Sequence, residues 1–158
     1  MRAVLLIPAA LLLLCAAALH AQGAAAPAAQ AAPLQWGPAP AAFPPGAKMA
    51  VVSGDPSKPG PFTIQLSMPD GYRIPPHFHP TDEGVEVKEG MFLFGTGDTF
   101  QAPKLKHLMV GDKGSLPANM HHFAQAKGAT VVAVTSTGPF AMTYVNATDD
   151  PRTPPSKP

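Results

Sequence analysis

The sequence has little that would support a disulfide-bonded, nucleic-acid-binding or long-helical protein. Its 158 residues include one cysteine, and only 13% are charged. The formal net charge is +1 at pH 7, so the chain lacks the excess of basic residues that binds a phosphate backbone, and we expect no nucleic-acid partner. No stretch beyond the N-terminal region keeps a helical apolar period of about 3.6 residues. The 21 prolines and 14 glycines also disfavour long helices.

Residues 1–21 have the composition of a secretory signal. Arg2 precedes a strongly apolar run that ends in small residues, and we expect cleavage after Ala21. As a membrane anchor, the run 3–19 would be at the short limit of the roughly 17–25 residues that span a bilayer. We therefore predict a periplasmic or secreted protein with no membrane contact after cleavage. Cys15 lies within the signal, so the mature chain would have neither disulfides nor thiolate metal ligands.

Composition divides the rest of the chain into a spacer, one domain and a tail. Residues 22–33 are rich in alanine and proline, which predicts a flexible spacer. The domain is expected at 34–151, because the chain is long enough for one hydrophobic core and too short for two. Residues 152–158 are polar and proline-rich, so we expect a disordered tail.

Short apolar or alternating runs, separated by glycine, proline and aspartate, follow Lys48. Each run has the length of a strand, and there is no room for crossover helices. Roughly eight to ten such strands predict an all-β fold, an antiparallel sandwich or closed barrel. Ahead of them, Leu34, Trp36 and Phe43 indicate an extended arm that packs along the domain. The arm and the edge strands are compatible with a homodimer.

Two histidines one residue apart, His77 and His79, follow a Pro-Pro pair. Residues two apart on a strand point to the same face, so both imidazoles can approach one ion. Taken alone, a His-x-His pair is more often accidental than a metal site. Here Glu83 follows after a Pro-Thr-Asp bend and can fold back toward the same point; Asp82 is the alternative, but it lies within the bend. Imidazole with carboxylate suits Mn, Fe, Ni, Co, Cu or Zn rather than Mg or Ca.

With its flanking glycines, this stretch resembles the first motif of the cupins, G-x5-H-x-H-x3-E-x6-G. The defined positions are Gly71, His77, His79, Glu83 and Gly90. The segments WGPAP, GDPSKPGPFT and TYVNATDDP add to a similarity with small bacterial cupin-domain proteins of undefined activity.

A second segment resembles the other cupin motif, G-x5-P-x-G-x2-H-x3-N. Its positions are Gly111, Pro117, Asn119, His122 and Ala126. Asn119 replaces the usual glycine, and asparagine is the non-glycine residue that best tolerates a positive φ, so we expect the turn to survive. Ala126 replaces the closing asparagine, which is not a metal ligand in the motif.

The resemblance implies a cupin-type antiparallel jelly-roll β-barrel that holds one divalent transition metal. Carried over by position, the ligands are His77, His79, Glu83 and His122. The metal could be Fe, Mn, Zn, Ni, Co or Cu. His121 is the rival of His122, because a one-residue slip exchanges which imidazole faces inward, but the motif spacing favours His122. A further histidine, His107, matches neither motif and is expected at the surface.

Four protein ligands leave one or two open positions on a metal that prefers five or six. The resemblance therefore implies a metalloenzyme that acts on a small molecule, as an oxygenase or isomerase, without identifying a catalytic residue, and the N-terminal signal predicts that it is exported. The carboxylates nearest the site in sequence are Asp82 and Glu86. The alternative is a non-catalytic module that binds or senses a metal and a ligand.

Strand alternation suggests which other residues face the pocket. If His122 faces inward, Met120 and Ala124 are expected on the same side. In the run 91–94, alternation leaves two pairs open: Met91 with Leu93, or Phe92 with Phe94. Arg73 is either a partner for an anionic ligand at the barrel mouth or an ordinary surface residue.

Overall fold

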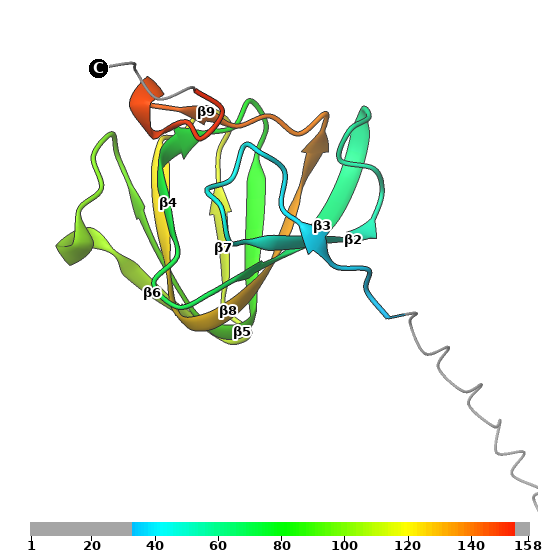
Figure 1. The fold of residues 1–158 in the computed structure, drawn as a ribbon, viewed down its shortest axis with the longest axis horizontal. Coiled ribbons are helices and arrows are strands. Elements are labelled where there is room, and N and C mark those ends of the chain that lie inside the picture. Colours follow the sequence, from blue (N-terminus) through cyan, green and yellow to red (C-terminus); the bar gives the residue numbers. More distant parts are fainter. Residues whose placement is uncertain (1–32, 154–158) are drawn as a thin grey trace, which may run out of the picture. The chain divides into compact units, whose positions relative to one another are not determined.

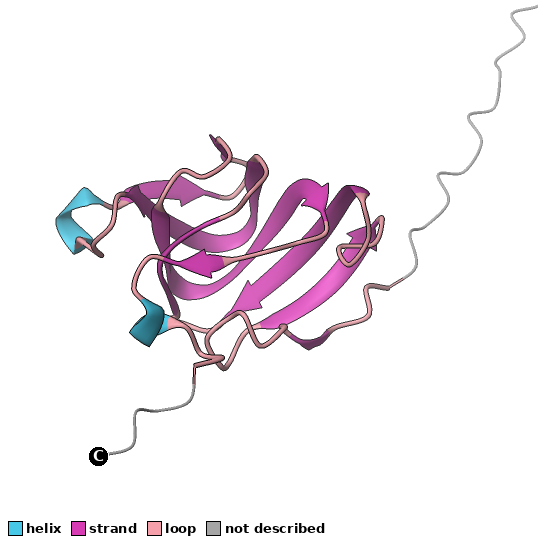
Figure 2. Ribbon diagram, turned by 90° about the horizontal axis from the view of Figure 1, so that it is seen from above, coloured by secondary structure: helices cyan, strands magenta, loops and turns pink. Residues whose placement is uncertain are grey.

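The computed structural model describes residues 33–153, so the predicted signal, nearly all of the predicted spacer and residues 154–158 lie outside the described residues. Within this range no helix is long and apolar enough to cross a membrane. Figures 1 and 2 show that the described chain consists mainly of strands joined by loops. It also contains two short 3₁₀ helices. The strands are β1 (Gly37–Pro38), β2 (Lys48–Ser53), β3 (Gly60–Met68), β4 (Arg73–Phe78), β5 (Glu83–Thr96), β6 (Lys106–Met109), β7 (Lys113–Leu116), β8 (His122–Gly138) and β9 (Thr143–Tyr144). The 3₁₀ helices are η1 (Ala102–Lys104) and η2 (Ala147–Asp149). The predicted all-β class is confirmed.

The two longest strands, β5 and β8, pair with each other and connect the nine strands of the described chain into one antiparallel sheet. The first part of β5 also pairs with β7, and its second part pairs with β6. Similarly, β8 pairs with β4 near its start and with β3 from Thr130 onward. The β5–β8 ladder therefore belongs to two half-sheets, β1-β2-β3-β8-β5-β7 and β9-β4-β8-β5-β6.

The ladder bends where the two half-sheets meet. On β5 the register shifts on either side of Glu89, and Gly90 has φ = +72°. A Cβ at Gly90 would lie 2.3 Å from the carbonyl oxygen of Ala129, so strands β5 and β8 approach each other too closely here for a larger residue. An irregularity of this kind increases the local bend of a strand pair. Figure 1 shows β5 and β8 turning together at the lower edge of the barrel, so the sheet curls back on itself.

The core lies between the two half-sheets and follows from strand alternation. On β3 every second residue is buried, namely Phe62, Ile64, Leu66 and Met68. These side chains belong to one cluster with Val132 and Val134 of β8 and with residues of the other half-sheet. Full burial of such a side chain contributes about 1.5–3 kcal/mol. Packing of this core stabilises the barrel, since the described residues contain no cysteine.

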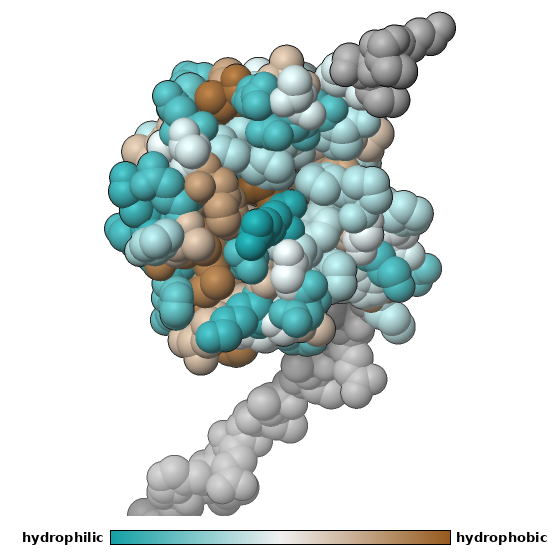
Figure 3. All heavy atoms as spheres, turned by 60° about the vertical axis from the view of Figure 1, so that its left-hand side comes forward, coloured by the Kyte–Doolittle hydropathy of each residue, from teal (hydrophilic) through white to brown (hydrophobic). Residues whose placement is uncertain are grey.

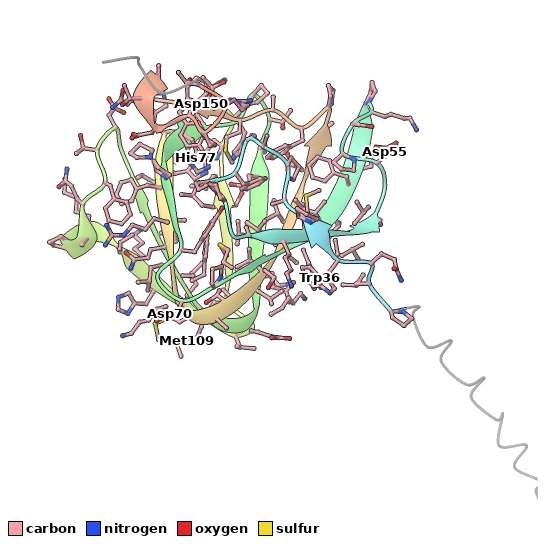
Figure 4. All side chains as sticks on the ribbon, viewed as in Figure 1. Trp36, Asp55, Asp70, His77, Met109 and Asp150 are labelled. Carbon is pink, nitrogen blue, oxygen red and sulfur yellow. The ribbon has the colours of Figure 1, made fainter. Side chains whose placement is uncertain are left out.

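The arm ahead of β2 packs on the domain through a different residue from the one expected. Phe43 is buried, and its ring stacks on Phe140 with centroids 5.8 Å apart. Trp36, in contrast, is 41% exposed. It lies where the arm reaches β1 (Figure 4). The prediction that Trp36 packs into the domain is therefore wrong. The short β1 ladder to β2 holds the backbone there, while the indole stays at the surface.

The ordered chain continues beyond the predicted domain boundary at Pro151. The guanidinium of Arg152 donates to both carboxylate oxygens of Asp150 at 2.8 Å and to the carbonyl oxygen of Met142 at 2.9 Å. These contacts hold residues 150–152 against the segment between β8 and β9.

Candidate metal centre

Three histidines converge inside one end of the barrel. His77 on β4 and His122 on β8 are direct partners in the antiparallel ladder, so their side chains share a face. His79 follows the end of β4, and all three are at most 5% exposed. Each offers a ring nitrogen, and these nitrogens lie within 4.8 Å of one another. Figure 4 shows His77 toward the same end of the barrel as Asp150, with Met109 at the opposite end.

Backbone carbonyl groups orient all three imidazoles in the same way. The Nδ1–H group of His77 donates to the carbonyl oxygen of Pro75 at 2.7 Å, and that of His79 donates to Ala141 O at 2.8 Å. The Nδ1–H group of His122 donates to Met120 O at 2.9 Å. With Nδ1 protonated, the lone pair of each neutral ring is on Nε2. Hydrogen bonds of this kind fix the tautomer and the ring orientation of metal-binding histidines.

Glu83, the first residue of β5, lies beside these rings. Its two carboxylate oxygens are 3.7 Å from Nε2 of His79 and 3.3 Å from Nε2 of His122. Asp82, in contrast, points away, because its carboxylate accepts the backbone N–H of Ala118 at 2.8 Å. The structure thus brings the four predicted ligands together and gives Asp82 a role in holding the loop before β8.

The other two histidines of the domain lie outside this group. His121 stacks on Phe78 with ring centroids 4.9 Å apart, and its Nδ1 is 2.6 Å from the carboxylate of Asp98. His121 precedes β8, which begins at His122, and its side chain is 36% exposed beside Phe78 rather than among the three buried rings. His107 is exposed on β6, as expected.

The buried ring nitrogens fit a divalent cation. Among the described residues, Nε2 of His79 is a fully buried polar atom without a hydrogen-bond partner. Leaving such an atom unpaired costs about 1–3 kcal/mol. Burial lowers the pKa of His77 well below its usual range, and the neighbouring His122 and His79 lower it further. Neutral imidazoles and a carboxylate are donors that first-row transition metals accept.

Three of the four candidate ligands border an interior pocket, and His79 is not among its lining residues. His77, Glu83 and His122 line it on one side, and apolar side chains line the rest. Of the two pairs left open by the sequence, Phe92 and Phe94 face this pocket.

Strand alternation predicted that Ala124 and Met120 face the pocket together with His122. Ala124 lines the pocket, as expected. The prediction for Met120 is wrong: its side chain is 39% exposed, because β8 begins only at His122 and Met120 lies in the preceding turn, where its N–H donates to Pro117 O.

Arg73 and Glu86, whose roles the sequence did not decide, do not face the pocket. The guanidinium of Arg73 lies over the ring of Phe100, 4.8 Å from its centroid, and Arg73 is not a lining residue. Glu86 is on the outer face of β5, where its carboxylate pairs with Lys88 at 2.6 Å and Lys113 at 3.6 Å. Arg73 is therefore a surface residue, and Glu86 is not placed to act on a ligand in the pocket.

No family model and no curated protein matches the sequence, but solved structures match the fold. A cupin 2 conserved barrel domain protein from Rhodopseudomonas palustris is similar with a TM-score of 0.57 and 15% identity, over 73% of this chain and 80% of that chain. The polyketide cyclase RemF from Streptomyces resistomycificus is similar with a TM-score of 0.56 and 16% identity, over 66% of this chain and 75% of that chain. KdgF from Halomonas sp. is similar with a TM-score of 0.51 and 20% identity, over 66% of this chain and 86% of that chain.

At these identities the similarity concerns the fold. It agrees with the curled antiparallel sheet and with the two motif segments, which meet where β4 pairs with β8. The chain therefore has the fold of the cupin superfamily.

Proposed function

We propose that this chain is an exported cupin that binds one divalent transition metal on His77, His79, Glu83 and His122. Its function is to act on a small molecule, as an oxygenase or isomerase type of metalloenzyme. The observation that carries the proposal is the group of three buried imidazoles, oriented by backbone carbonyl groups, in which the Nε2 of His79 has no hydrogen-bond partner within the described part of the chain.

The residues of the chain would contribute orientation and exclusion of water. The carbonyl groups of Pro75, Ala141 and Met120 hold the rings, so little reorganisation is needed when a cation binds. The apolar lining keeps bulk water from the inner side of the site. When bound, a metal of this class supplies a Lewis-acid or redox centre with open coordination positions.

A non-catalytic module that binds a metal and a ligand is the second candidate. It is favoured by the composition of the pocket, whose lining residues include no acid or base other than the proposed metal ligands. The enzyme proposal has support from RemF, a structural neighbour that is a polyketide cyclase. Oxygen uptake or isomerisation by the metal-loaded protein, in a screen of small molecules, would separate the two candidates.

Metal content tests the proposed ligands directly. We expect His79→Ala to lose most of the bound metal, because it removes one of four ligands, whereas His107→Ala, on the exposed part of β6, should keep it. Elemental analysis of the purified proteins measures this, with circular dichroism as a check of folding. A folded His79→Ala protein with the metal content of the wild type would refute the assignment.

Export is part of the proposal and has its own test. Residues 22–158 contain no cysteine, which fits a protein that needs no disulfide in an oxidising compartment. We expect the intact mass of the protein from a periplasmic extract to correspond to a chain that begins at Gln22. Recovery of the chain only from the cytoplasm, starting at Met1, would contradict this.

A further inference from the structure

The pocket beside the candidate metal centre is unusually poor in polar groups. Apart from His77, Glu83 and His122, all of its lining residues are apolar or glycine. They come from both half-sheets, for example Ile64 and Val132 from one and Phe92 from the other. No lysine or arginine is among them. A ligand that enters this pocket would therefore meet polar groups only at the metal centre.

The pocket is small and has a partly exposed rim. The free space is about 40 Å³, which is room for roughly three water molecules at about 10–15 Å³ each. Phe94 of β5 and Leu108 of β6 line it and are only partly buried. Leu108 packs over Gly114 of β7, where an added Cβ would lie 3.6 Å from its Cδ1. On the side of the barrel that carries β6, Figure 3 shows hydrophobic residues gathered in a hollow.

The charges at the site limit what can bind there. A divalent cation with the carboxylate of Glu83 has a net charge of about +1, which one anionic or strongly polar group of a ligand can balance. A second charged group would lie against apolar side chains without a partner, and burying an unpaired charge is strongly unfavourable. Several hydroxyl groups would also remain without hydrogen bonds.

We infer that this pocket takes a small, largely apolar molecule with a single metal-binding oxygen group, and that Leu108 limits the length of its apolar part. The inference rests on the proposed metal site. It narrows the proposed function, because it excludes sugars with several hydroxyl groups, dicarboxylates and phosphate esters as ligands of the inner pocket.

Matched carboxylates can test the polarity of the pocket. Butyrate and succinate have the same number of carbon atoms and differ in that a methyl group replaces the second carboxylate. We would load the full protein with Co²⁺ and follow its visible absorption while each compound is added. The dissociation constant of butyrate should be at least about tenfold lower than that of succinate. Equal or tighter binding of succinate would overturn the inference.

The same titration separates a failure of the inference from a failure of the proposed function. Retention of Co²⁺ is measured before any carboxylate is added. If the wild type retains none, the metal site is refuted and the inference falls with it. If Co²⁺ is retained and succinate binds at least as well as butyrate, the metal site stands and only the inference is overturned.

A pair of variants on β6 tests the role of Leu108. In Leu108→Ala the apolar end of the pocket gains space, so the affinity for hexanoate should rise at least fivefold while Co²⁺ content stays unchanged. Met109→Ala is the matched control, because Met109 is the next residue on the strand, is 51% exposed and does not line the pocket. If Leu108→Ala does not fold, Leu108→Val makes a smaller enlargement. Unchanged hexanoate binding in the folded variant would overturn the assignment.

Discussion

Asn119, a residue of the second motif in the turn before β8, contacts the candidate site through its backbone. Asn119 has φ = +62°, and it is the one residue other than glycine in the described chain with a positive φ. Its backbone N–H donates to the carbonyl oxygen of His79 at 2.7 Å. The turn therefore holds the chain next to one proposed ligand, and its geometry depends on a residue that tolerates the left-handed region.

Substitution of Asn119 should show this dependence. We expect Asn119→Gly to keep the stability of the wild type, because glycine adopts a positive φ without steric cost. Asn119→Val should lower the free energy of unfolding by about 1–2 kcal/mol, since a β-branched side chain is strained there. Urea denaturation of the three proteins measures the difference. A valine variant as stable as the glycine variant would show that the turn tolerates strain.

At this scale the sequence predicted which candidate ligands lie close together, and it predicted the positions of some neighbouring side chains wrongly. The spacing of His77, His79 and Glu83 identified residues that the structure brings together, because a strand followed by a short bend leaves few alternatives. Alternation was misleading for Met120, which lies ahead of the strand to which the rule applies. The exposed position of Trp36 depends on where the arm pairs with β2, and the local sequence does not contain that information.

At the scale of elements, two tyrosines tie the N-terminal arm to the barrel. Tyr72 donates a hydrogen bond to the carbonyl oxygen of Pro44, and Tyr144 donates one to Ala42 O at 2.7 Å. Burial raises the pKa of Tyr72 to about 12. Burial also raises the pKa of Tyr144. Both hydroxyl groups therefore remain protonated in the folded protein at a pH where they would ionise in the unfolded chain.

Alkaline pH should weaken this attachment. Because the folded pKa of Tyr72 is higher than the value of 10.0 for the free side chain, its contribution is complete below pH 10 and is lost as the pH rises to about 12. Tyr72→Phe should cost about 1 kcal/mol at pH 7, through the lost hydrogen bond. This difference from the wild type should shrink between pH 10 and 12, as measured by guanidinium denaturation. A difference that does not change with pH would contradict the explanation.

The sequence predicted the number of strands better than their extent. Among the short apolar runs separated by glycine, proline and aspartate are GVEVKEG at 84–90 and MFLFGTGD at 91–98, and Gly90 divides them into two strand-length runs. In the structure the single strand β5 (Glu83–Thr96) covers the first run and most of the second, and Gly90 marks a bend within it. The difference arises because β8 bends alongside and keeps the ladder paired, which is a long-range contact that no local pattern reveals.

At the scale of the whole molecule, the candidate centre lies where several parts of the barrel meet. His77 and His122 belong to the half-sheet of β4, while Glu83 begins the part of β5 that pairs with β7. His79 is held by Ala141, which lies in the segment between β8 and β9. A cation bound to all four would therefore link both half-sheets and that segment.

Removal of the metal should thus lower the thermal stability. At a free metal concentration of about 100 times the dissociation constant, binding stabilises a protein by about 2.7 kcal/mol. For a domain of this size that corresponds to a change in Tm of about 10 °C. Thermal melts with added Zn²⁺ or with EDTA measure the shift, and His79→Ala is the control in which it should be nearly absent. Identical melting of the wild type under both conditions would argue against a bound cation.

The continuous path of β5 and β8 through both half-sheets has a consequence for folding. Each half-sheet depends on strands that the other half-sheet also needs, so neither can form an autonomous folding unit. Backbone amides in the centres of both halves should then exchange with solvent through one cooperative opening. The barrel cannot hinge apart along a seam to admit a bulky molecule, and entry to its interior depends on the side chains at the rim.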